Sequence, residues 1–459
     1  MRATQTTVGT HPEPRQRGAV RCLRCIEPWY AAFFAANLVM GTSSVLIPLK
    51  IDRVLHQGPS QLGILATCAS LAAMLGSLLW GRLSDAIHRR KAFVVASYLM
   101  IGVAHVGLAV SPSLAGLVLH NTLLSFFWVA NASVAVLLVI ERQDEGTWES
   151  KISVLNLSGA TGWLLGLVLG GFGVSAAFVE LSLTSGMQAL LLALSALGFV
   201  AAALAAWLVP TTRARFTKRT FRGVAIAVGN LLVEAWRFNP LHLYHRSSIR
   251  RLLSLRRETR LFLVASALAF TGIGFFAVPL ALLLSQRLGY SPSLVFYGYV
   301  VLHSGIVLAY PFALHRIRRA GNRRVQMAAV GTRAALFALA AGVLWLTSGI
   351  PWGATAPFLF LVGVSWSFFQ LSGVALASRL AKPENRGLAL GTYNAIAGAS
   401  STVAGVCSGY LAQLVGHHIT YVVASVLLLC AIVVLGRLPD PSEISAETQT
   451  AERAVAEAP

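Results

Sequence analysis

Apolar runs of about 20 residues recur along the whole chain, and this feature restricts the fold more than any other. Hydrophobic residues make up 56% of the 459 residues, whereas charged residues make up only 12%. A soluble domain carries about 25% charged residues, and about 20 apolar residues suffice for an α-helix to cross a bilayer. The composition therefore predicts an all-α integral membrane protein.

Twelve apolar runs predict twelve transmembrane helices, in two groups of six. The predicted spans of the first group are 28–49, 61–81, 92–111, 115–140, 152–174 and 186–209. Those of the second group are 261–284, 293–314, 325–347, 353–376, 387–412 and 417–436. Short matches between the two groups indicate an internal duplication, which is a common way to build transporters. The predicted fold is two six-helix bundles.

The segments outside the spans complete the predicted organisation. A polar tail, 1–27, precedes the N-terminal bundle, 28–209, and an acidic tail, 437–459, with the composition of a disordered segment, follows the C-terminal bundle, 261–436. The connection between the bundles, 210–260, is strongly basic. Its stretch GVAIAVGNLLVEAWRF leaves two interpretations open: a helix lying on the inner membrane surface, or a disordered cationic linker.

The distribution of positive charge predicts the orientation. The formal net charge is +20. If both termini are cytoplasmic, only Lys50, Arg53 and Arg287 fall on the outer side and only Arg333 within a span. This asymmetry follows the positive-inside rule. We expect a plasma (inner) membrane protein with cytoplasmic termini, and we attribute its basicity to topology and anionic lipid head groups, not to nucleic acid.

Motifs for catalysis or cofactor binding are absent from the sequence. We find no HExxH, no Gly-x-Ser-x-Gly and no Walker A loop. The CLRC stretch at 22–25 lacks the second ligand pair that a zinc site needs. We expect a monomer that is not an enzyme and that needs no metal and no cofactor.

The connection between the second and third spans, GRLSDAIHRRK, concentrates charge in an otherwise apolar chain. A carboxylate at a membrane boundary is costly unless cations or a helix N-terminus satisfy it, so Asp85 needs a functional explanation. The stretch resembles the signature of the major facilitator superfamily between helices 2 and 3. The residues that match it are Gly81, Leu83, Asp85, Arg89, Arg90 and Lys91.

The resemblance implies a secondary transporter, not driven by ATP, that moves a small organic solute by alternating access. It also implies a conformational latch. Asp85 would hold the outward-open form by facing the start of helix 11, near 385–388. Arg89 and Arg90 would pair with an acid at the inner end of helix 4, for which Glu141 and Asp144 are the candidates.

Glycines recur in helix 5, at Gly162, Gly166, Gly170 and Gly171. The stretch resembles the glycine-rich signature of the family's antiporters, which lets helices 5 and 8 approach closely. Leu167 stands where that signature usually has proline. Packing through small residues explains the glycines without implying a direction of transport, so both interpretations stay open.

The resemblance also implies that helices 1, 4, 7 and 10 line a central substrate cavity. Polar side chains inside a bilayer turn towards partners or water, although helix packing explains each of them equally well. The candidates on these spans are Asn37, Ser44, Asn121, Ser125, Trp128, Asn131, Thr271, Trp366 and Gln370.

No Asp or Glu lies clearly inside a predicted span. If a proton is the coupling ion, a histidine must carry it, and among His303, His105 and His120 we favour His303. Arg333 lies near the inner boundary; we expect it to extend its side chain to the membrane surface and regard anion binding as the alternative.

The lack of an intramembrane acid predicts a substrate that is neutral, amphipathic or weakly anionic. Two other functions stay open. One is a proton-coupled efflux antiporter for drugs or metabolites, and the other is a non-transporting membrane sensor with the same fold.

Overall fold

The computed structural model describes residues 27–87, 90–140, 148–180, 182–210, 255–347, 349–381 and 386–439. Within these ranges the regular secondary structure is helical. Eleven helices are long and apolar enough to cross a membrane, and the apolar part of a twelfth, Leu114–Ala130, is shorter. The predicted all-α fold with twelve membrane-spanning segments is confirmed.

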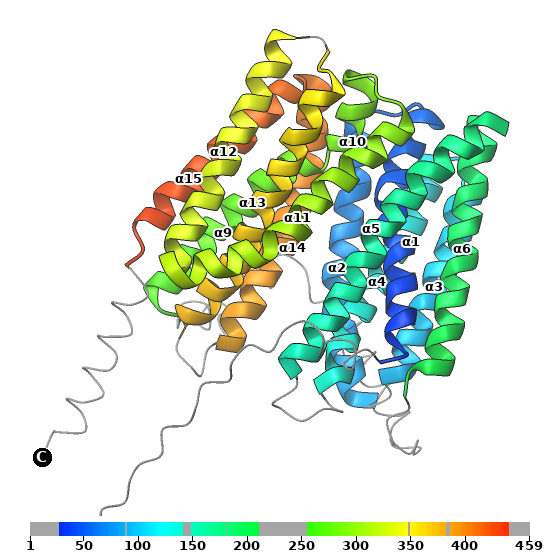
Figure 1. Cartoon of the computed structure of the whole chain (residues 1–459), viewed down its shortest axis with the longest axis horizontal. Helices are drawn as coiled ribbons and strands as arrows, with labels where there is room; N and C mark the ends of the chain where they lie inside the picture. The colour runs from blue at the N-terminus through cyan, green and yellow to red at the C-terminus, as the bar shows by residue number, and fades with distance from the viewer. Residues whose placement is uncertain are drawn as a thin grey trace, which may run out of the picture.

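The helices form two side-by-side groups, which we call the N-half and the C-half (Figure 1). The N-half contains α1 (Tyr30–Arg53), α2 (Pro59–Ile87), α3 (Arg90–Val110), α4 (Leu114–Ile140), α5 (Trp148–Glu180) and α6 (Leu183–Leu208). The C-half contains α9 (Arg257–Ala277), α10 (Leu280–Leu282), η4 (Leu283–Arg287), α11 (Pro292–Ala320), α12 (Asn322–Leu346), α13 (Trp352–Arg379), α14 (Arg386–Leu414) and α15 (His417–Gly436).

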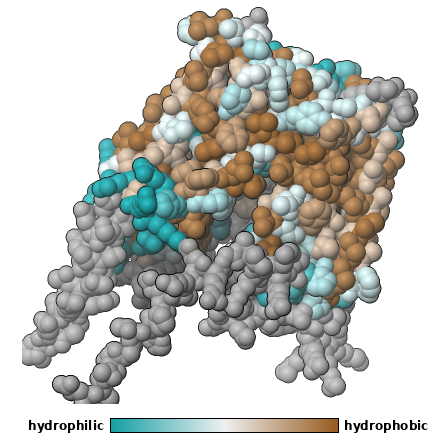
Figure 2. All heavy atoms as spheres, viewed as in Figure 1, coloured by the Kyte–Doolittle hydropathy of each residue, from teal (hydrophilic) through white to brown (hydrophobic). Residues whose placement is uncertain are grey.

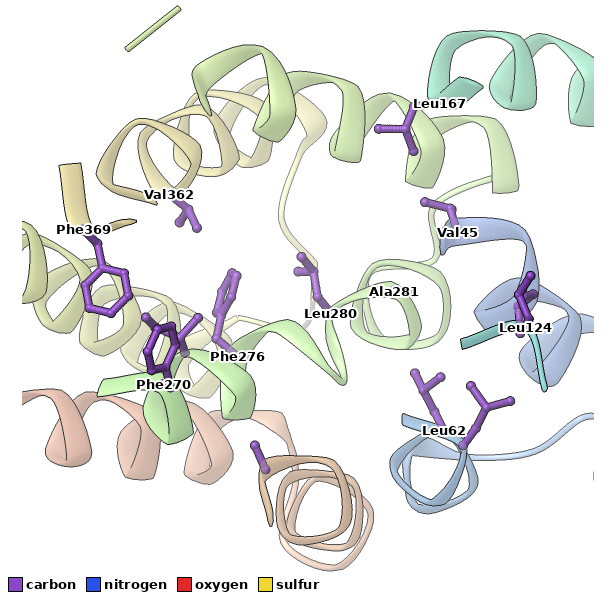
Figure 3. Packing of buried hydrophobic residues seen from close by; sticks show 14 of the residues in the cluster. Val45, Leu62, Leu124, Leu167, Phe270, Phe276, Leu280, Ala281, Val362 and Phe369 are labelled. Atoms are coloured by element: carbon purple, nitrogen blue, oxygen red, sulfur yellow. The ribbon is translucent and has the colours of Figure 1, made fainter. Parts of the chain in front are cut away.

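The connections α1–α2 and η4–α11 lie at the same end of the molecule (Figure 1). The charge pattern predicts that this end faces outwards, and we call it the outer end. Helix α2 packs against α14, and α5 packs against α11, so these two pairs join the halves. Buried apolar residues fill both halves, and Leu280 and Ala281 of α10 lie between the two groups (Figure 3).

The surface is apolar where a bilayer would surround it. Large hydrophobic side chains such as Phe312, Trp345 and Leu346 are 70%, 78% and 83% exposed. Hydrophobic residues cover much of the visible face, and hydrophilic residues gather near the inner ends of α11 and α12 (Figure 2). Exposed apolar area of this extent is typical of contact with lipid.

The seventh predicted span, 261–284, is not one continuous α-helix. Helix α9 ends at Ala277, Pro279 precedes the single turn α10, and η4 is a π-helical turn in which the amide of Leu288 donates to the carbonyl of Leu283 at 3.0 Å. Proline removes a backbone donor and breaks an α-helix, and π-helical turns often occur at functional sites. The break lies where the chain meets α1 of the N-half.

Several helices extend past the apolar runs that predicted them. The predicted second span stops at residue 81, whereas α2 continues to Ile87. Hydropathy detects only the part of a helix inside the hydrocarbon, while backbone hydrogen bonds continue into the polar boundary. Asp85 therefore belongs to the last turn of α2 and not to a loop.

Candidate functional site

A cavity of about 430 Å³ lies between the halves, near the middle of the helices. Small-molecule sites in proteins typically occupy about 300–1,000 Å³. Its walls are mostly apolar, from Phe270, Ile273, Leu302, Ile306 and Val362, and α2 contributes Ala66 and Ser70. The residues with polar groups that line the cavity from the C-half are Tyr299, His303, Arg333, Trp366 and Ser401.

Arg333 is the one cation among the described residues that line this cavity. Its side chain is buried, with the residue only 3% exposed, and Nη2 donates to the carbonyl of Val362 at 2.9 Å. The guanidinium carbon lies 5.2 Å from the centroid of the Trp366 ring, a cation–π distance. The expectation that Arg333 extends to the membrane surface is therefore wrong. The expectation followed from the position of Arg333 near one end of its span. In the structure, Arg333 lies on the face of α12 that packs against α13.

An aromatic row crosses from the N-half to the cavity. The ring of Trp163 on α5 lies 6.5 Å from that of Trp128 on α4 and 6.2 Å from the imidazole of His303 on α11. The ring of Tyr299 also stacks with that of His303, at 6.5 Å between the centroids. The carbonyl of Tyr299 can only accept, so the 2.9 Å contact places a proton on His303 Nδ1. Nε2 is then the ring nitrogen that can accept a proton.

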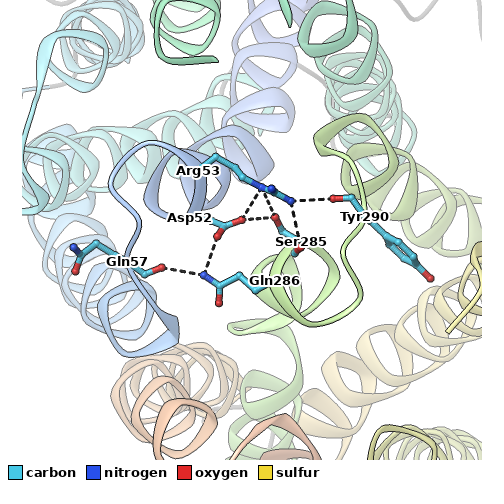
Figure 4. Close-up of polar contacts among 6 residues, drawn as sticks. All are labelled: Asp52, Arg53, Gln57, Ser285, Gln286 and Tyr290. Atoms are coloured by element: carbon cyan, nitrogen blue, oxygen red, sulfur yellow. Dashed lines mark hydrogen bonds and ion pairs between the residues drawn. The ribbon is translucent and has the colours of Figure 1, made fainter. Parts of the chain in front are cut away.

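A polar network joins the halves at the outer end (Figure 4). Asp52 of α1 is 8% exposed and accepts hydrogen bonds from Ser285 Oγ and, at 2.8 Å, from Gln286 Nε2. Arg53 donates to Ser285 Oγ at 3.0 Å and to the Tyr290 carbonyl at 3.2 Å. We call these five residues, Asp52, Arg53, Ser285, Gln286 and Tyr290, the outer gate.

Two further contacts join the halves, one at the outer end and one at the level of the cavity. The Ser60 amide donates to Gln413 Oε1 at 3.1 Å, and Thr67 Oγ1 donates to the Thr402 carbonyl at 2.9 Å, both between α2 and α14. In the part of the chain that the structure describes, the hydrogen bonds that join the halves lie at the outer end, except for the Thr67–Thr402 bond, which lies at the level of the cavity residues Ala66, Ser70 and Ser401. This arrangement closes the outer route.

The helix 5 glycines contact two different neighbours. A Cβ at Gly162 or Gly166 would meet the carbonyls of Phe34 and Leu38, so both glycines bring α5 against α1 within the N-half. A Cβ at Gly171 would meet Tyr297 at 3.0 Å, and one at Gly170 would meet Phe296 at 2.5 Å. These two glycines let α5 approach α11 across the halves.

The residues predicted to line the cavity are only partly brought together. Trp366 and His303 line it, and Trp128 reaches it through the ring of Trp163. Asn37 Nδ2 donates to the Phe33 carbonyl at 2.8 Å and lies against the α5 glycines.

Other polar candidates bond within their own helices. Ser44, Ser125 and Thr271 donate to the carbonyls of Gly41, Asn121 and Ala267. Asn121 is buried on α4, and Gln370 lies one turn beyond Trp366 on α13. Asn131 belongs to α4, but its side chain lies outside the described residues.

The predicted latch falls mostly at the edge of what the structure describes. Gly81 and Asp85 are in the last two turns of α2, and Arg90, which begins α3, is 5% exposed. The surroundings of Gly81 and the side chain of Asp85 lie outside what the structure describes, as do Arg89, Glu141 and Asp144. The CLRC stretch and most of the basic connection also lie outside them.

Sequence reasoning missed the outer gate. The sequence does contain a signal for the outer gate, because Asp52 lies between Lys50 and Arg53 at an outer boundary where charged residues are scarce. A partner 233 residues away, Ser285, could not be identified without the fold.

The comparisons with known proteins agree with this architecture. The family model described as Major Facilitator Superfamily matches residues 29–372 and 319–458. No functionally curated protein matches the sequence closely enough for comparison.

Solved structures share the fold at low identity. The nucleoside transporter NupG is 14% identical with a TM-score of 0.70, covering 90% of this chain and 99% of its own. A POT family transporter in complex with 5-aminolevulinic acid is 14% identical, with a TM-score of 0.67 and coverage of 92% and 96%.

A D-xylose-proton symporter is 13% identical, with a TM-score of 0.66 and coverage of 90% and 98%. At such identities the likeness concerns the fold, while the family match spans most of the chain. The chain belongs to the major facilitator superfamily and has the fold of its secondary transporters.

Proposed function

We propose that the protein moves a small organic solute across the membrane by alternating access, with the central cavity as its binding site. The observation that carries this proposal is a cavity of about 430 Å³ between two halves. Among the described residues, most hydrogen bonds between the halves lie on the outer side of this cavity. A site that is closed on one side and reachable from the other after a rocking motion is the requirement of alternating access. None of the described residues lining the cavity is acidic, which favours a solute that is neutral, amphipathic or weakly anionic.

The two ends of the molecule would then have complementary roles. The outer gate closes the outer route in the conformer described here. Asp85, with Gly81, Arg89, Arg90, Glu141 and Asp144, forms the opposite latch and stabilises the outward-open conformer. The proposal for this latch rests on the sequence signature and on the position of Asp85 in the last turn of α2.

We assign proton coupling to His303. It lines the cavity, and the hydrogen bond from Nδ1 to the Tyr299 carbonyl leaves Nε2 as the proton-exchanging atom. One of the structures with the same fold is named a proton symporter, which favours a proton as the coupling ion. A carboxylate is not required, because an imidazole can also bind and release a proton.

The remaining features of the proposal concern the setting. The protein acts as a monomer in the plasma membrane, with both termini in the cytoplasm and its basic inner surface in contact with anionic lipids. The tail 1–27, the halves 28–209 and 261–436, the connection 210–260 and the tail 437–459 are its functional divisions. No cofactor takes part.

Transport into proteoliposomes tests this proposal. Labelled neutral and anionic solutes are offered with and without an inward proton gradient, to the wild type and to the His303→Gln variant. We expect gradient-stimulated uptake in the wild type and uptake without stimulation in the variant. Uptake by the wild type that ignores the gradient would exclude proton coupling, and saturable binding without any uptake would favour a non-transporting sensor.

A further inference from the structure

Arg333 occupies an unusual environment for a charged side chain in a membrane protein. It is 3% exposed, and among the described residues no carboxylate pairs with it. Its Nε has no hydrogen-bond partner although the atom is buried. A guanidinium without a counter-charge in a low-dielectric interior is costly, so a structural role would have to offset that cost.

The observed contacts do not supply such a role. The carbonyl of Val362, which accepts from Arg333 Nη2 at 2.9 Å, also accepts from Ser365 Oγ at 2.8 Å. This carbonyl also lies inside the continuous helix α13, where the backbone already provides it with a donor. Removing Arg333 would therefore leave no acceptor unsatisfied at Val362.

The position of the guanidinium instead suits a ligand. Arg333 lines the cavity together with Trp366, whose ring lies 5.2 Å from its guanidinium carbon. The aromatic face holds the planar cation in one orientation, and Nε, which has no hydrogen-bond partner, remains a donor for an acceptor that enters the cavity. Tyr299 and His303 add further polar groups to the same cavity.

We infer that Arg333 is the counter-charge for an organic monoanion, a carboxylate or sulfonate with an apolar or aromatic body. This inference deepens the proposed function and rests on it only for the transport step. The described residues that line the cavity include one cation and no acid, so the cavity favours a solute with one negative charge. The apolar side chains of Phe270, Leu302 and Ile306 would contact the body of the solute, and an arginine matches an oxyanion with paired donors.

Three naphthalene probes that differ only in charge test the inference by equilibrium binding to the protein in lipid nanodiscs. They are 2-naphthoate, the neutral 2-naphthamide and the cationic 2-naphthylmethylammonium. We expect the wild type to bind naphthoate at least about tenfold more tightly than naphthamide, which is the low end of what a hydrogen bond to a charged group supplies. The cation should bind most weakly. This comparison uses only the wild type, so it tests the predicted preference for an anion even if a substitution prevents folding.

The variants locate the effect. Arg333→Gln should lose the preference for naphthoate and bind naphthamide as the wild type does, whereas Arg333→Lys should keep part of the preference. Arg323→Gln is the matched control, because Arg323 lies on the same helix and donates to the Gly436 carbonyl at 2.9 Å, away from the cavity. It should leave the affinities for all three probes unchanged.

Each failure has a distinct meaning. The inference would be overturned if the wild type bound naphthoate and naphthamide with equal affinity, or if it bound no measurable naphthoate. It would also be overturned if the preference for naphthoate survived in Arg333→Gln. Naphthoate that binds through Arg333 but is never taken up into proteoliposomes would overturn the proposed transport and leave the anion site standing. Uptake of neutral solutes by a wild type that shows no preference for naphthoate over naphthamide would overturn the anion site and leave the proposed transport standing.

Discussion

The Asp52→Asn substitution should shift the conformational equilibrium towards the form that is open at the outer end. Asp52 accepts one hydrogen bond at each carboxylate oxygen, from Ser285 Oγ and from Gln286 Nε2, and both donors belong to the C-half. Asparagine can still accept from Gln286 Nε2, and its NH₂ group can donate to the Ser285 hydroxyl, so both contacts can remain. Neither bond then involves a charged group of residue 52, and the ion pair with Arg53 Nε is lost.

A hydrogen bond to a charged group contributes about 1.5–3 kcal/mol. A neutral hydrogen bond contributes about 1 kcal/mol less. Weakening both bonds therefore destabilises the closed outer gate by about 2 kcal/mol and changes the ratio of the two conformers by about 30-fold. If the wild type populates the outward-open form at about 1%, within the usual range for minor states, the variant would populate it at roughly a quarter. A shift of this size is directly measurable.

Distances between two spin labels report these populations. Thr184 at the start of α6 and Gly349 between α12 and α13 are exposed and lie at the outer end of different halves. They are replaced by cysteine in a chain whose five natural cysteines are changed to serine. Double electron–electron resonance in nanodiscs should show a longer-distance population that grows in Asp52→Asn.

The control removes a carboxylate that does not join the halves. Glu27 pairs with Lys151 at 2.8 Å within the N-half, so Glu27→Gln should leave the outer distances unchanged. An Asp52→Asn protein that is folded but has the wild-type distance distribution would refute the reasoning. A shift of equal size in Glu27→Gln would show a general loosening and would refute it as well.

Three other substitutions follow from the contacts. Gly166→Ala should lower the free energy of unfolding by about 1–3 kcal/mol, measured by thermal unfolding in detergent, because the added Cβ would meet the Leu38 carbonyl. Gly342→Ala is the control and should lose no stability, because nothing lies within 4 Å of a Cβ at that position. Lys50→Met should lower the free energy of unfolding by about 1–3 kcal/mol in the same assay. Lys50 Nζ donates to the carbonyls of Leu108 and Ala109, at 2.5 and 3.2 Å, and so caps the end of α3. An unchanged melting temperature would contradict this capping role. Asp85→Asn should reduce the initial rate of solute uptake by about tenfold if the latch is worth about 1.4 kcal/mol, and unchanged uptake would remove the basis for the latch.

The sequence by itself determined the class of the protein. The apolar runs alone predicted the twelve helices, because the thickness of the bilayer sets the length of a span and hydropathy is a local property. The stretch around Gly81 and Asp85 pointed to the family that the comparisons then showed. Trp366 and His303 were identified as cavity residues because polar and aromatic groups inside a span are few.

Only the tertiary structure decided which polar groups meet. Arg333 was expected at the membrane surface, and it lies beside Trp366 in the cavity because the rotation of α12 about its own axis depends on packing against α13. Asn37 was expected in the cavity, and it packs against the α5 glycines instead. Asp52 and Ser285 are 233 residues apart along the chain. Hydropathy and motif spacing record each helix separately, whereas a binding site and a gate depend on how helices from both halves are turned and placed against one another.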